Sequence, residues 1–168
     1  CGFIHDAKQE SIDTLLKLIE LKKEKKLSGI VVAGCLVQRY VEDLRKEFPE
    51  VDAFVGSGDY RAIAEVLKKV AAGEKSVSVH RAGYLATAEE ARVALTPLYT
   101  RYLKISEGCD HQCSFCVIPS LRGPYRSRRI ADLVKEAKQL AEEGAKELVV
   151  IGQDITKFGW DYARKPLL

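Results

Sequence analysis

Hydrophobic side chains recur at helical spacing in three stretches of the first 73 residues. The positions are Ile12, Leu15, Leu16 and Ile19, then Val37, Val41, Leu44 and Phe48, then Ile63, Val66, Leu67 and Val70. Steps of three and four residues put such side chains on one face of an α-helix. A possible capping box of Asp6 and Gln9 opens the first helix, Pro49 closes the second, and Gly73 is a stop signal for the third.

Short apolar runs separate these helices. Residues 30–33 form an uninterrupted apolar run, typical of a strand buried on both faces of a parallel sheet, and residues 51–55 form another short strand. Alternating strands and helices predict an α/β layer, whose active crevice lies outside the carboxyl ends of the strands. Cys35 stands at such an end, and Cys1 would do so if a strand preceded it.

The last part of the chain predicts one strand-helix-strand unit. Residues 98–105 and Glu147–Ile151 are the strands. The helical positions between them are Ile130, Leu133, Val134, Ala137 and Leu140, with Gly144 as the stop. Such units are almost always right-handed, and repeats of them close into full or partial barrels with the chemistry at the carboxyl ends of the strands. One unit alone cannot close a barrel.

We therefore expect an α/β protein in two parts. Residues 1–73 form a partial N-terminal parallel-sheet domain, residues 74–97 form a linker that ends in a run of small residues, and residues 98–168 begin a (β/α) barrel. The 168 residues are 46% hydrophobic and 30% charged, which fits a globular chain. The chain contains no methionine and starts at Cys1 without a preceding strand, so we interpret it as an internal fragment.

Charge and hydropathy narrow the class of protein. The net charge of +3 does not by itself indicate a nucleic-acid partner. No run approaches the roughly 18 apolar residues of a membrane span, and no export signal is visible, so we expect a cytoplasmic protein. The lysines at 22–26 are interpreted as the solvated end of a helix in preference to a nucleic-acid patch. Residues 56–58 lack the spacing of a phosphate loop, so an ordinary strand-to-helix turn is preferred there.

Three of the five cysteines lie close together, at Cys109, Cys113 and Cys116, directly after the predicted strand at 98–105. Thiolates bind zinc or iron–sulfur clusters. A structural zinc site needs four ligands, and only His111 is near enough to complete it, at the cost of a strained loop. Three thiolates on a 4Fe-4S cluster leave one iron open for chemistry. An odd cysteine count without a secretory segment makes a disulfide role less favoured.

A run of arginines follows the cysteines. Arg122, Arg126, Arg128 and Arg129, together with Tyr125, form the densest basic patch of the sequence. One interpretation is a solvated entry to the next helix. Another is recognition of an anion beside the cluster, such as a cofactor carboxylate or a substrate acid, for which guanidinium groups are well suited. RNA binding is a third, although a single tyrosine offers little stacking surface.

The cysteine motif, C-x3-C-x-Φ-C with Phe115 as the aromatic residue, resembles the signature of radical S-adenosylmethionine enzymes. The resemblance implies that Cys109, Cys113 and Cys116 hold a 4Fe-4S cluster whose open iron binds S-adenosylmethionine. The reduced cluster cleaves this cofactor to a 5′-deoxyadenosyl radical, and an electron donor such as flavodoxin or ferredoxin supplies the electron. The protein orients the cofactor and excludes side reactions.

A wider resemblance is to the methylthiotransferases, and it covers almost the whole chain. It is carried by residues 1–4, by Gly34-Cys35-Leu36-Val37-Gln38-Arg39 and by residues 103–123. The family has a second 4Fe-4S cluster in its N-terminal domain, held by three cysteines. Cys1 and Cys35 match the second and third of these ligands, and the first would lie upstream.

Residues 1–4, residues 104–111 and Gly152-Gln153-Asp154 are most similar to the branch of the family that modifies a ribosomal protein. The implied activity adds a methylthio group to the β-carbon of an aspartate in the twelfth protein of the small ribosomal subunit. The adenosyl radical removes a hydrogen atom and the auxiliary cluster delivers the sulfur. The alternative is the branch that acts on modified adenosines of tRNA.

Smaller assignments complete the expected site. Phe115, Arg122, Gln153 and Asp154 are candidate cofactor-binding residues, although ordinary capping of a strand end explains Gln153 and Asp154 equally well. The competing hypothesis from a different class is a binding module, in which the cysteine loop folds around zinc or an iron–sulfur centre to recognise RNA or a ribosomal surface. Metal content separates the two, because the enzyme requires iron.

Overall fold

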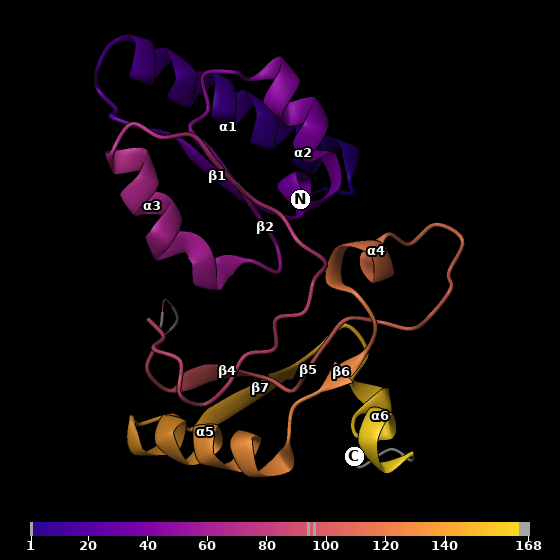
Figure 1. Ribbon diagram of the computed structural model, residues 1–168. Helices are drawn as coiled ribbons and strands as arrows, with labels where there is room; N and C mark the ends of the chain where they lie inside the picture. The colour runs from indigo at the N-terminus through magenta and orange to yellow at the C-terminus, as the bar shows by residue number, and fades with distance from the viewer. Residues whose placement is uncertain (1, 94, 96, 165–168) are drawn as a thin grey trace. The chain divides into compact units, whose positions relative to one another are not determined.

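The structure, a computed structural model, describes residues 2–93, 95 and 97–164. The chain divides between Gly83 and Tyr84 into two compact units, and no sheet of the described residues includes strands of both (Figure 1). Parallel strands and helices alternate in both units, so the predicted α/β fold class is confirmed. Among the described helices, none is long and apolar enough to cross a membrane.

The first unit is built on a three-stranded parallel sheet in the order β1-β2-β3. The strands are β1 (Val31–Gly34), β2 (Ala53–Gly56) and β3 (Ser76–Ser78). Every residue of the central strand β2 is buried. β3 pairs with β2 although it lies inside the expected linker 74–97. The first unit therefore extends past residue 73, because β2 offers a second edge that β3 covers.

Helices cover both faces of this sheet (Figure 1). On one face α1 (His5–Lys23) and α2 (Cys35–Glu47) pack against Phe54 in the larger core. On the other face α3 (Ile63–Ala71), preceded by the short helix η1 (Tyr60–Ala62), packs on Ala53 and Val55. Successive β2 side chains point to opposite faces, so one strand supplies both cores. Of the predicted helical stripes, Leu15, Ile19, Val37, Leu44 and Val66 are buried.

The predicted capping box at the start of α1 is wrong. α1 begins at His5 after Ile4, with no side-chain cap, and Gln9 instead donates to Asp13 one turn later at 2.9 Å. Residues four positions apart are neighbours on the surface of a helix, which allows Gln9 to pair with Asp13. The predicted stops are confirmed, since Gly73 and Gly144 both have positive φ directly after helices.

The lysine-rich end of α1 is only partly solvated, contrary to the prediction. Lys22 Nζ lies 2.6 Å from an Asp52 carboxylate oxygen and 2.7 Å from the carbonyl oxygen of Glu50. Asp52 also accepts the backbone N–H of Ile30 at 2.7 Å. These contacts tie the end of α1 to the starts of β1 and β2.

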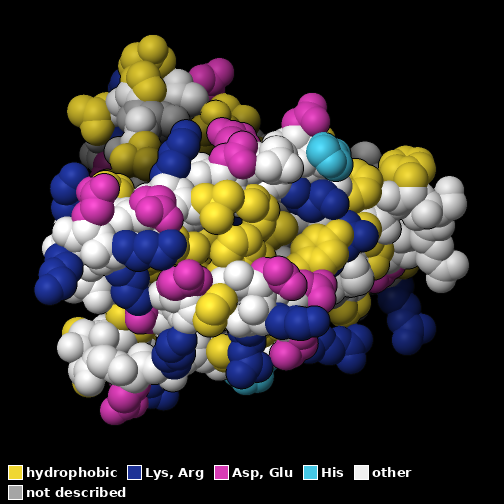
Figure 2. Space-filling view, turned by 90° about the horizontal axis from the view of Figure 1, so that it is seen from above, with side chains coloured by type: hydrophobic (Ala, Val, Ile, Leu, Met, Phe, Trp, Pro, Cys, Tyr) yellow, Lys and Arg dark blue, Asp and Glu magenta, His cyan; other side chains and the backbone are white. Residues whose placement is uncertain are grey.

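Hydrophobic side chains gather in the middle of the face shown in Figure 2, bordered by charged side chains. A groove of about 330 Å³ runs along α1 and α2, with Ile12, Leu36, Leu44 and Phe48 among its lining residues. Tyr40, which also lines it, interrupts the helical backbone of α2 with φ −129°.

The second unit contains the predicted strand-helix-strand motif. β4 (Thr100–Lys104) and β7 (Glu147–Ile151) pair in parallel along their full length, and α5 (Ile130–Glu142) connects them. Leu103, Ile105, Leu133 and Phe158 form the small core. β7 has the predicted bounds, whereas β4 begins two residues later than the predicted strand.

The connection from β4 to α5 holds elements that the sequence pattern did not predict. β5 (Ser106–Glu107) pairs antiparallel with β6 (Arg126–Ser127), and α4 (Ile118–Arg122) lies between them. After β7 come the short helices η2 (Ile155–Lys157) and α6 (Trp160–Ala163). The cysteine loop spans residues 108–117, between β5 and α4.

Candidate metal centre

The cysteine loop begins with a close backbone approach. Gly108 has φ +82°, and a Cβ at this position would overlap the carbonyl oxygens of Gly123 and Pro124. Only glycine fits both the backbone conformation and the space. The next residue, Cys109, donates its backbone N–H to Gly123 O at 3.2 Å, and Asp110 accepts the N–H of Tyr125 at 2.8 Å. The start of the loop is therefore fixed to residues 123–125.

The three thiols differ in environment. Cys109 is buried, Cys116 is half-buried and Cys113 is exposed, and none of them forms a disulfide. The Cys116 N–H donates to Cys113 O at 3.0 Å, and the Cys116 sulfur accepts the Ile118 N–H at 3.5 Å. Phe115 is 75% exposed.

The thiols are neighbours on one loop but do not converge. Within the described part of the chain, no three Cys, His, Asp or Glu side chains are gathered as a metal site. The donor set itself, three thiols with a backbone N–H directed at one sulfur, is the type that holds an iron–sulfur cluster. The residues therefore fit such a cluster in chemistry.

His111, the alternative fourth ligand, is held by Asp154. Its Nε2 lies 2.8 Å from an Asp154 carboxylate oxygen, and Asp154 also accepts the N–H and the hydroxyl of Thr156 at 3.0 and 2.6 Å. The Thr156 hydroxyl, followed by His111, lowers the pKa of Asp154 against the opposing effect of burial. Asp154 thus caps η2 and holds the imidazole, which agrees with the capping alternative for this residue.

Gln153, the residue before Asp154, holds the start of the cysteine loop. Its Oε1 accepts the N–H of Gly108 at 3.0 Å. Gly152 brings the backbone close, because a Cβ there would lie 2.5 Å from the hydroxyl of buried Ser106. The segment after β7, predicted to hold the cofactor, therefore lies against the start of the cysteine loop.

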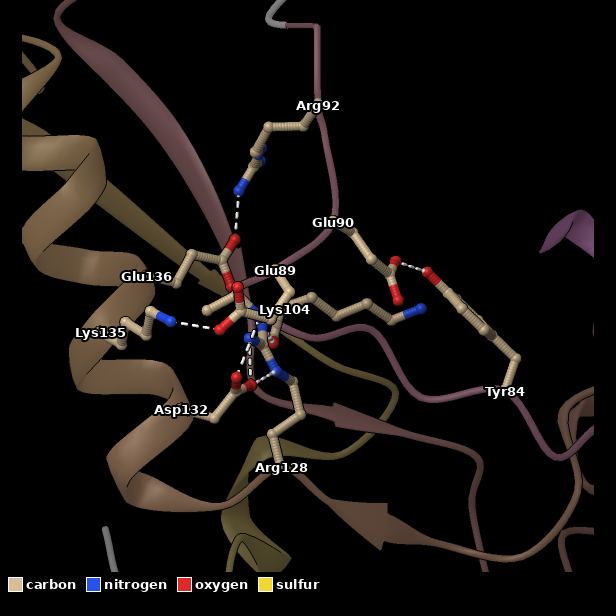
Figure 3. A network of polar contacts seen from close by, with 10 residues as sticks. Tyr84, Glu89, Glu90, Arg92, Lys104, Arg128, Asp132, Lys135 and Glu136 are labelled. Atoms are coloured by element: carbon tan, nitrogen blue, oxygen red, sulfur yellow. Dashed lines mark hydrogen bonds and ion pairs between the residues drawn. The ribbon is translucent and has the colours of Figure 1, made fainter.

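The arginine run is mostly engaged by protein groups. Arg128 is 2% exposed, pairs with Asp132 and Glu136 at 2.5 Å each, and donates to Lys104 O at 2.9 Å (Figure 3). The solvated interpretation is wrong for this residue, because two acidic residues of α5 neutralise its charge. Arg129 lies over the ring of Tyr162, with its guanidinium carbon 4.9 Å from the centroid.

The same network attaches residues 84–92 to the second unit. Arg92 reaches Glu136 and donates to Tyr102 O at 2.9 Å, while Glu89 pairs with Lys135. The Ala88 N–H donates to Asp132 at 2.9 Å. Figure 3 shows these side chains converging on α5 from the chain segment beside it. Part of the expected linker is therefore docked onto the second unit.

Glu107 is a residue of the site that the sequence pattern did not predict. Its carboxylate is buried, contacts Lys104 Nζ, and lies 3.5 Å from Arg122 Nη1. Arg122, a candidate cofactor-binding residue, thus has an acidic partner inside the protein. The available signal was the spacing of Lys104 and Glu107, but the strand pattern gave no reason to expect a buried carboxylate.

In the first unit, Cys35 is the first residue of α2 and is half-buried. Gly2 lies close to it, since a Cβ on Gly2 would be 2.6 Å from Cys35 O. Arg39 holds the same segment by donating to Gly2 O at 2.9 Å. Cys1, the other predicted ligand in this unit, lies outside the described residues.

Comparison with known proteins gives two family matches. Residues 1–56 match the family described as Uncharacterized protein family UPF0004, and residues 103–164 match the Radical SAM superfamily. Over 168 residues the chain is 51% identical to ribosomal protein uS12 methylthiotransferase RimO of Clostridioides difficile and 48% identical to that of Pelotomaculum thermopropionicum. The protein of the same name from Citrifermentans bemidjiense is 50% identical over 169 aligned residues.

Each of these three matches covers 100% of this chain and 38% of the relative, so the chain spans less than half the length of the curated relatives it matches. Both family matches fall on units that the structure also separates, with the cysteine loop inside the second. The chain therefore contains a segment of the UPF0004 family, residues 1–56, followed by a segment of the Radical SAM superfamily, residues 103–164, and it is similar along its whole length to the methylthiotransferases named above.

Proposed function

We propose that the chain is part of an enzyme that transfers a methylthio group to the β-carbon of an aspartate in ribosomal protein uS12. The relatives named for uS12 methylthiotransferase activity support this proposal, because their identity with the chain extends through both units. The observation that carries it is the loop 108–117, in which three thiols follow the end of a parallel strand pair.

Cys109, Cys113 and Cys116 would hold a 4Fe-4S cluster. Such a cluster, with S-adenosylmethionine at its open iron, supplies a 5′-deoxyadenosyl radical. The chain's own residues set where the cluster forms: Gly108 allows the close approach to residues 123–124, and Gln153 holds the Gly108 N–H. Buried Cys109 is the fixed ligand, and exposed Cys113 is free to adjust. Electrons would come from a donor such as flavodoxin or ferredoxin.

Gln153 and Asp154 remain candidates for contact with the cofactor, because the turn after β7 lies against the start of the loop. Arg122 is a weaker candidate, since Glu107 already engages its guanidinium group. Phe115, the aromatic residue of the cysteine motif, is exposed beside Cys116 and remains a candidate for contact with the cofactor.

A second cluster would form in the first unit on Cys35 and Cys1, with a further cysteine from outside this chain. The contact of Gly2 with the backbone of Cys35, and the hydrogen bond from Arg39, support this pairing because they hold the residue after Cys1 beside Cys35. A cluster held there would supply the sulfur for transfer to the substrate carbon.

Anaerobic reconstitution of the 168-residue chain with iron and sulfide tests the cluster. We expect about four irons bound at the loop, the content of one cubic cluster, with a broad visible absorption band. We also expect 5′-deoxyadenosine when reductant and S-adenosylmethionine are added. Stoichiometric zinc with no iron, and no deoxyadenosine, would favour the binding-module hypothesis.

A test of the substrate requires a protein of the relatives' length. A chimera in which this chain replaces the matching 168 residues of the Clostridioides difficile relative provides one. Expressed in cells without their own enzyme, it is expected to add the mass of a methylthio group to uS12. The same modification on digested tRNA nucleosides, with unmodified uS12, would assign the chain to the tRNA branch.

A further inference from the structure

Glu107 is a buried charged group beside the cysteine loop that the mechanism above does not use. It is 4% exposed, belongs to β5, and precedes Cys109 by two residues. Its strand partner in the β5–β6 pair is Arg126. A carboxylate in such surroundings is retained only if cations and hydrogen bonds compensate for its lost hydration.

The partners of Glu107 come from both ends of the loop. Lys104, at the end of β4, contacts Oε2, whereas Arg122, the last residue of α4, approaches Oε1 at 3.5 Å. α4 begins two residues after Cys116, so the contact with Arg122 joins the segment before the first cysteine to the helix after the last one. The hydrogen bond from the Cys109 N–H to Gly123 O, at 3.2 Å, also joins the start of the loop to the residue after α4.

The ion pair of Glu107 and Arg122 differs from exposed surface ion pairs, which contribute little to stability. The Glu107 side chain is 6% exposed and that of Arg122 is 24% exposed, so solvent screens their attraction only partly. Glu107 Oε1 has no hydrogen-bond partner within the described residues, and Arg122 at 3.5 Å is its compensating charge. Loss of Arg122 would leave the buried carboxylate with Lys104 as its cation among the described residues, and loss of Glu107 would remove the link between β5 and α4.

The charges also match what the loop is proposed to hold. Thiolates around a cluster bring negative charge into this region, which a buried carboxylate alone would disfavour. Lys104 and Arg122 together exceed the charge of Glu107 by one positive unit. Glu107 pairs with both cations beside the loop.

We propose that Glu107 is a positioning residue that closes the cysteine loop at its base, through Arg122 and Lys104, and so holds Cys109 ready for the cluster. This inference rests on the proposed iron–sulfur function of the loop. It predicts an effect on the empty loop as well as on the assembled cluster, so it can be tested before any catalysis is measured.

The test compares Glu107→Gln with Glu136→Gln in the 168-residue chain. Both substitutions remove a buried carboxylate that pairs with arginine in the second unit, but Glu136 lies on α5. In the metal-free chain, hydrogen exchange at the Cys109 amide is expected to be about tenfold faster in Glu107→Gln, the factor expected for one lost interaction of ordinary strength. Glu136→Gln is expected to leave this amide unchanged.

The reduction potential of the reconstituted cluster gives the second readout. Removal of a negative charge beside the cluster makes addition of an electron easier, so the potential is expected to rise in Glu107→Gln and to stay unchanged in Glu136→Gln. The double variant Glu107→Gln/Arg122→Gln tests the coupling, and its Cys109 exchange is expected to be closer to the parent rate than that of the single variant.

The outcomes separate this inference from the function on which it rests. If the parent chain takes up no iron, the proposed function fails. If the parent binds a cluster, but Glu107→Gln matches it in Cys109 exchange and in potential, the positioning role is overturned. If the amides of β7 also exchange faster in Glu107→Gln, the whole unit has been destabilised, and the comparison is then made with Glu107→Asp. That variant keeps the charge but shortens the side chain by one methylene group, which takes the carboxylate away from Arg122, so faster exchange at the Cys109 amide is expected and an unchanged amide would count against the role.

Discussion

At the scale of single residues, the described structure separates the side chains that hold the cysteine loop from those available to bind metal. Asp110, Gln153 and Glu107 fix the start of the loop through contacts with residues 122–125 and the turn after β7. Cys113 and Phe115 lie exposed at its outer part. A loop with one fixed end and one adjustable end suits a cluster that is assembled after folding.

The three thiols should be individually required. We expect Cys113→Ala to abolish cleavage of S-adenosylmethionine, because two thiolates cannot hold the cubic cluster with one open iron. Cys35→Ala is the matched control, since it removes a thiol from the other unit. Deoxyadenosine release should persist there while methylthio transfer stops in the chimera. Release at the parent rate from Cys113→Ala would refute the assignment of the loop.

His111 provides a sharper distinction between iron and zinc. Its imidazole is held by Asp154 at 2.8 Å, and we expect His111→Gln to keep the full iron content of the reconstituted chain. A zinc site of three cysteines and one histidine would lose affinity by orders of magnitude on the same change. Iron and zinc per chain, measured by mass spectrometry, decide between the two, and loss of iron in this variant would make His111 a ligand.

Gly108 tests whether the close backbone approach matters. Gly108→Ala would put a Cβ into the carbonyl oxygens of Gly123 and Pro124, so the loop could not dock and iron uptake is expected to fall below a tenth of the parent value. Gly144→Ala is the matched control, because Gly144 also has positive φ but nothing within 4 Å of an added Cβ. That control is expected to cost about 1 kcal/mol and to leave iron uptake unchanged.

At the scale of elements, prediction from sequence succeeded where periodicity was long enough to be specific. α5 and β7 have the expected positions because their hydrophobic positions repeat along most of each element. β5, β6 and α4 escaped prediction because two to five residues hold no periodic signal. Contacts between residues distant in sequence, such as Tyr125 with Asp110, stabilise them.

The site shows the same division. Three thiols at short spacing can be recognised in the sequence as a metal site, because only cysteine supplies thiolate ligands. Burial of Arg128 and Glu107 could not be read from the sequence, since it depends on partners that the fold brings together. For Arg128 the partners are Asp132 and Glu136 on the next helix, so the basic patch of the sequence becomes an internal ion network in the structure.

The contact between α1 and the sheet of the first unit makes stability depend on pH. Burial would raise the pKa of Asp52, but hydrogen bonds from Lys22 and Ile30 outweigh it and hold the pKa below its usual 3.8. A lowered folded-state pKa adds stability that is complete above the unfolded value and is lost as pH falls through the folded value. The unit should therefore lose stability below about pH 4.

Asp52→Asn removes this dependence. We expect it to cost about 1–2 kcal/mol at pH 7 and little at pH 2, since the charged partner of Lys22 is then absent in both proteins. Hydrogen exchange of the β2 amides, measured at both pH values, reports the difference. Asp43→Asn, a carboxylate of α2 beside the groove, is the control. An equal cost of Asp52→Asn at both pH values would contradict the proposed role of the ion pair.

At the scale of the whole molecule, the two units differ in how well they bury their hydrophobic side chains. The first unit has helices on both faces of its sheet and two core clusters. Among its described residues the second has one cluster of four buried residues, whereas Tyr102, Leu148, Val150 and Ile151 on its two parallel strands are 36–44% exposed. Small domains with little buried surface are marginally stable.

This difference predicts unequal behaviour of the separated units. Expressed alone, residues 1–83 are expected to unfold in a single cooperative thermal transition, because helices cover both faces of the sheet. Residues 84–168 are expected to bind a hydrophobic dye and to associate as concentration rises, because strand side chains of the β4–β7 sheet stay exposed. Val150→Lys should reduce that association, whereas Lys138→Ala, on the polar side of α5, should not. Monomeric behaviour of 84–168 without dye binding would mean that its exposed strand residues need no cover, and that the small core around Leu103 suffices for this unit.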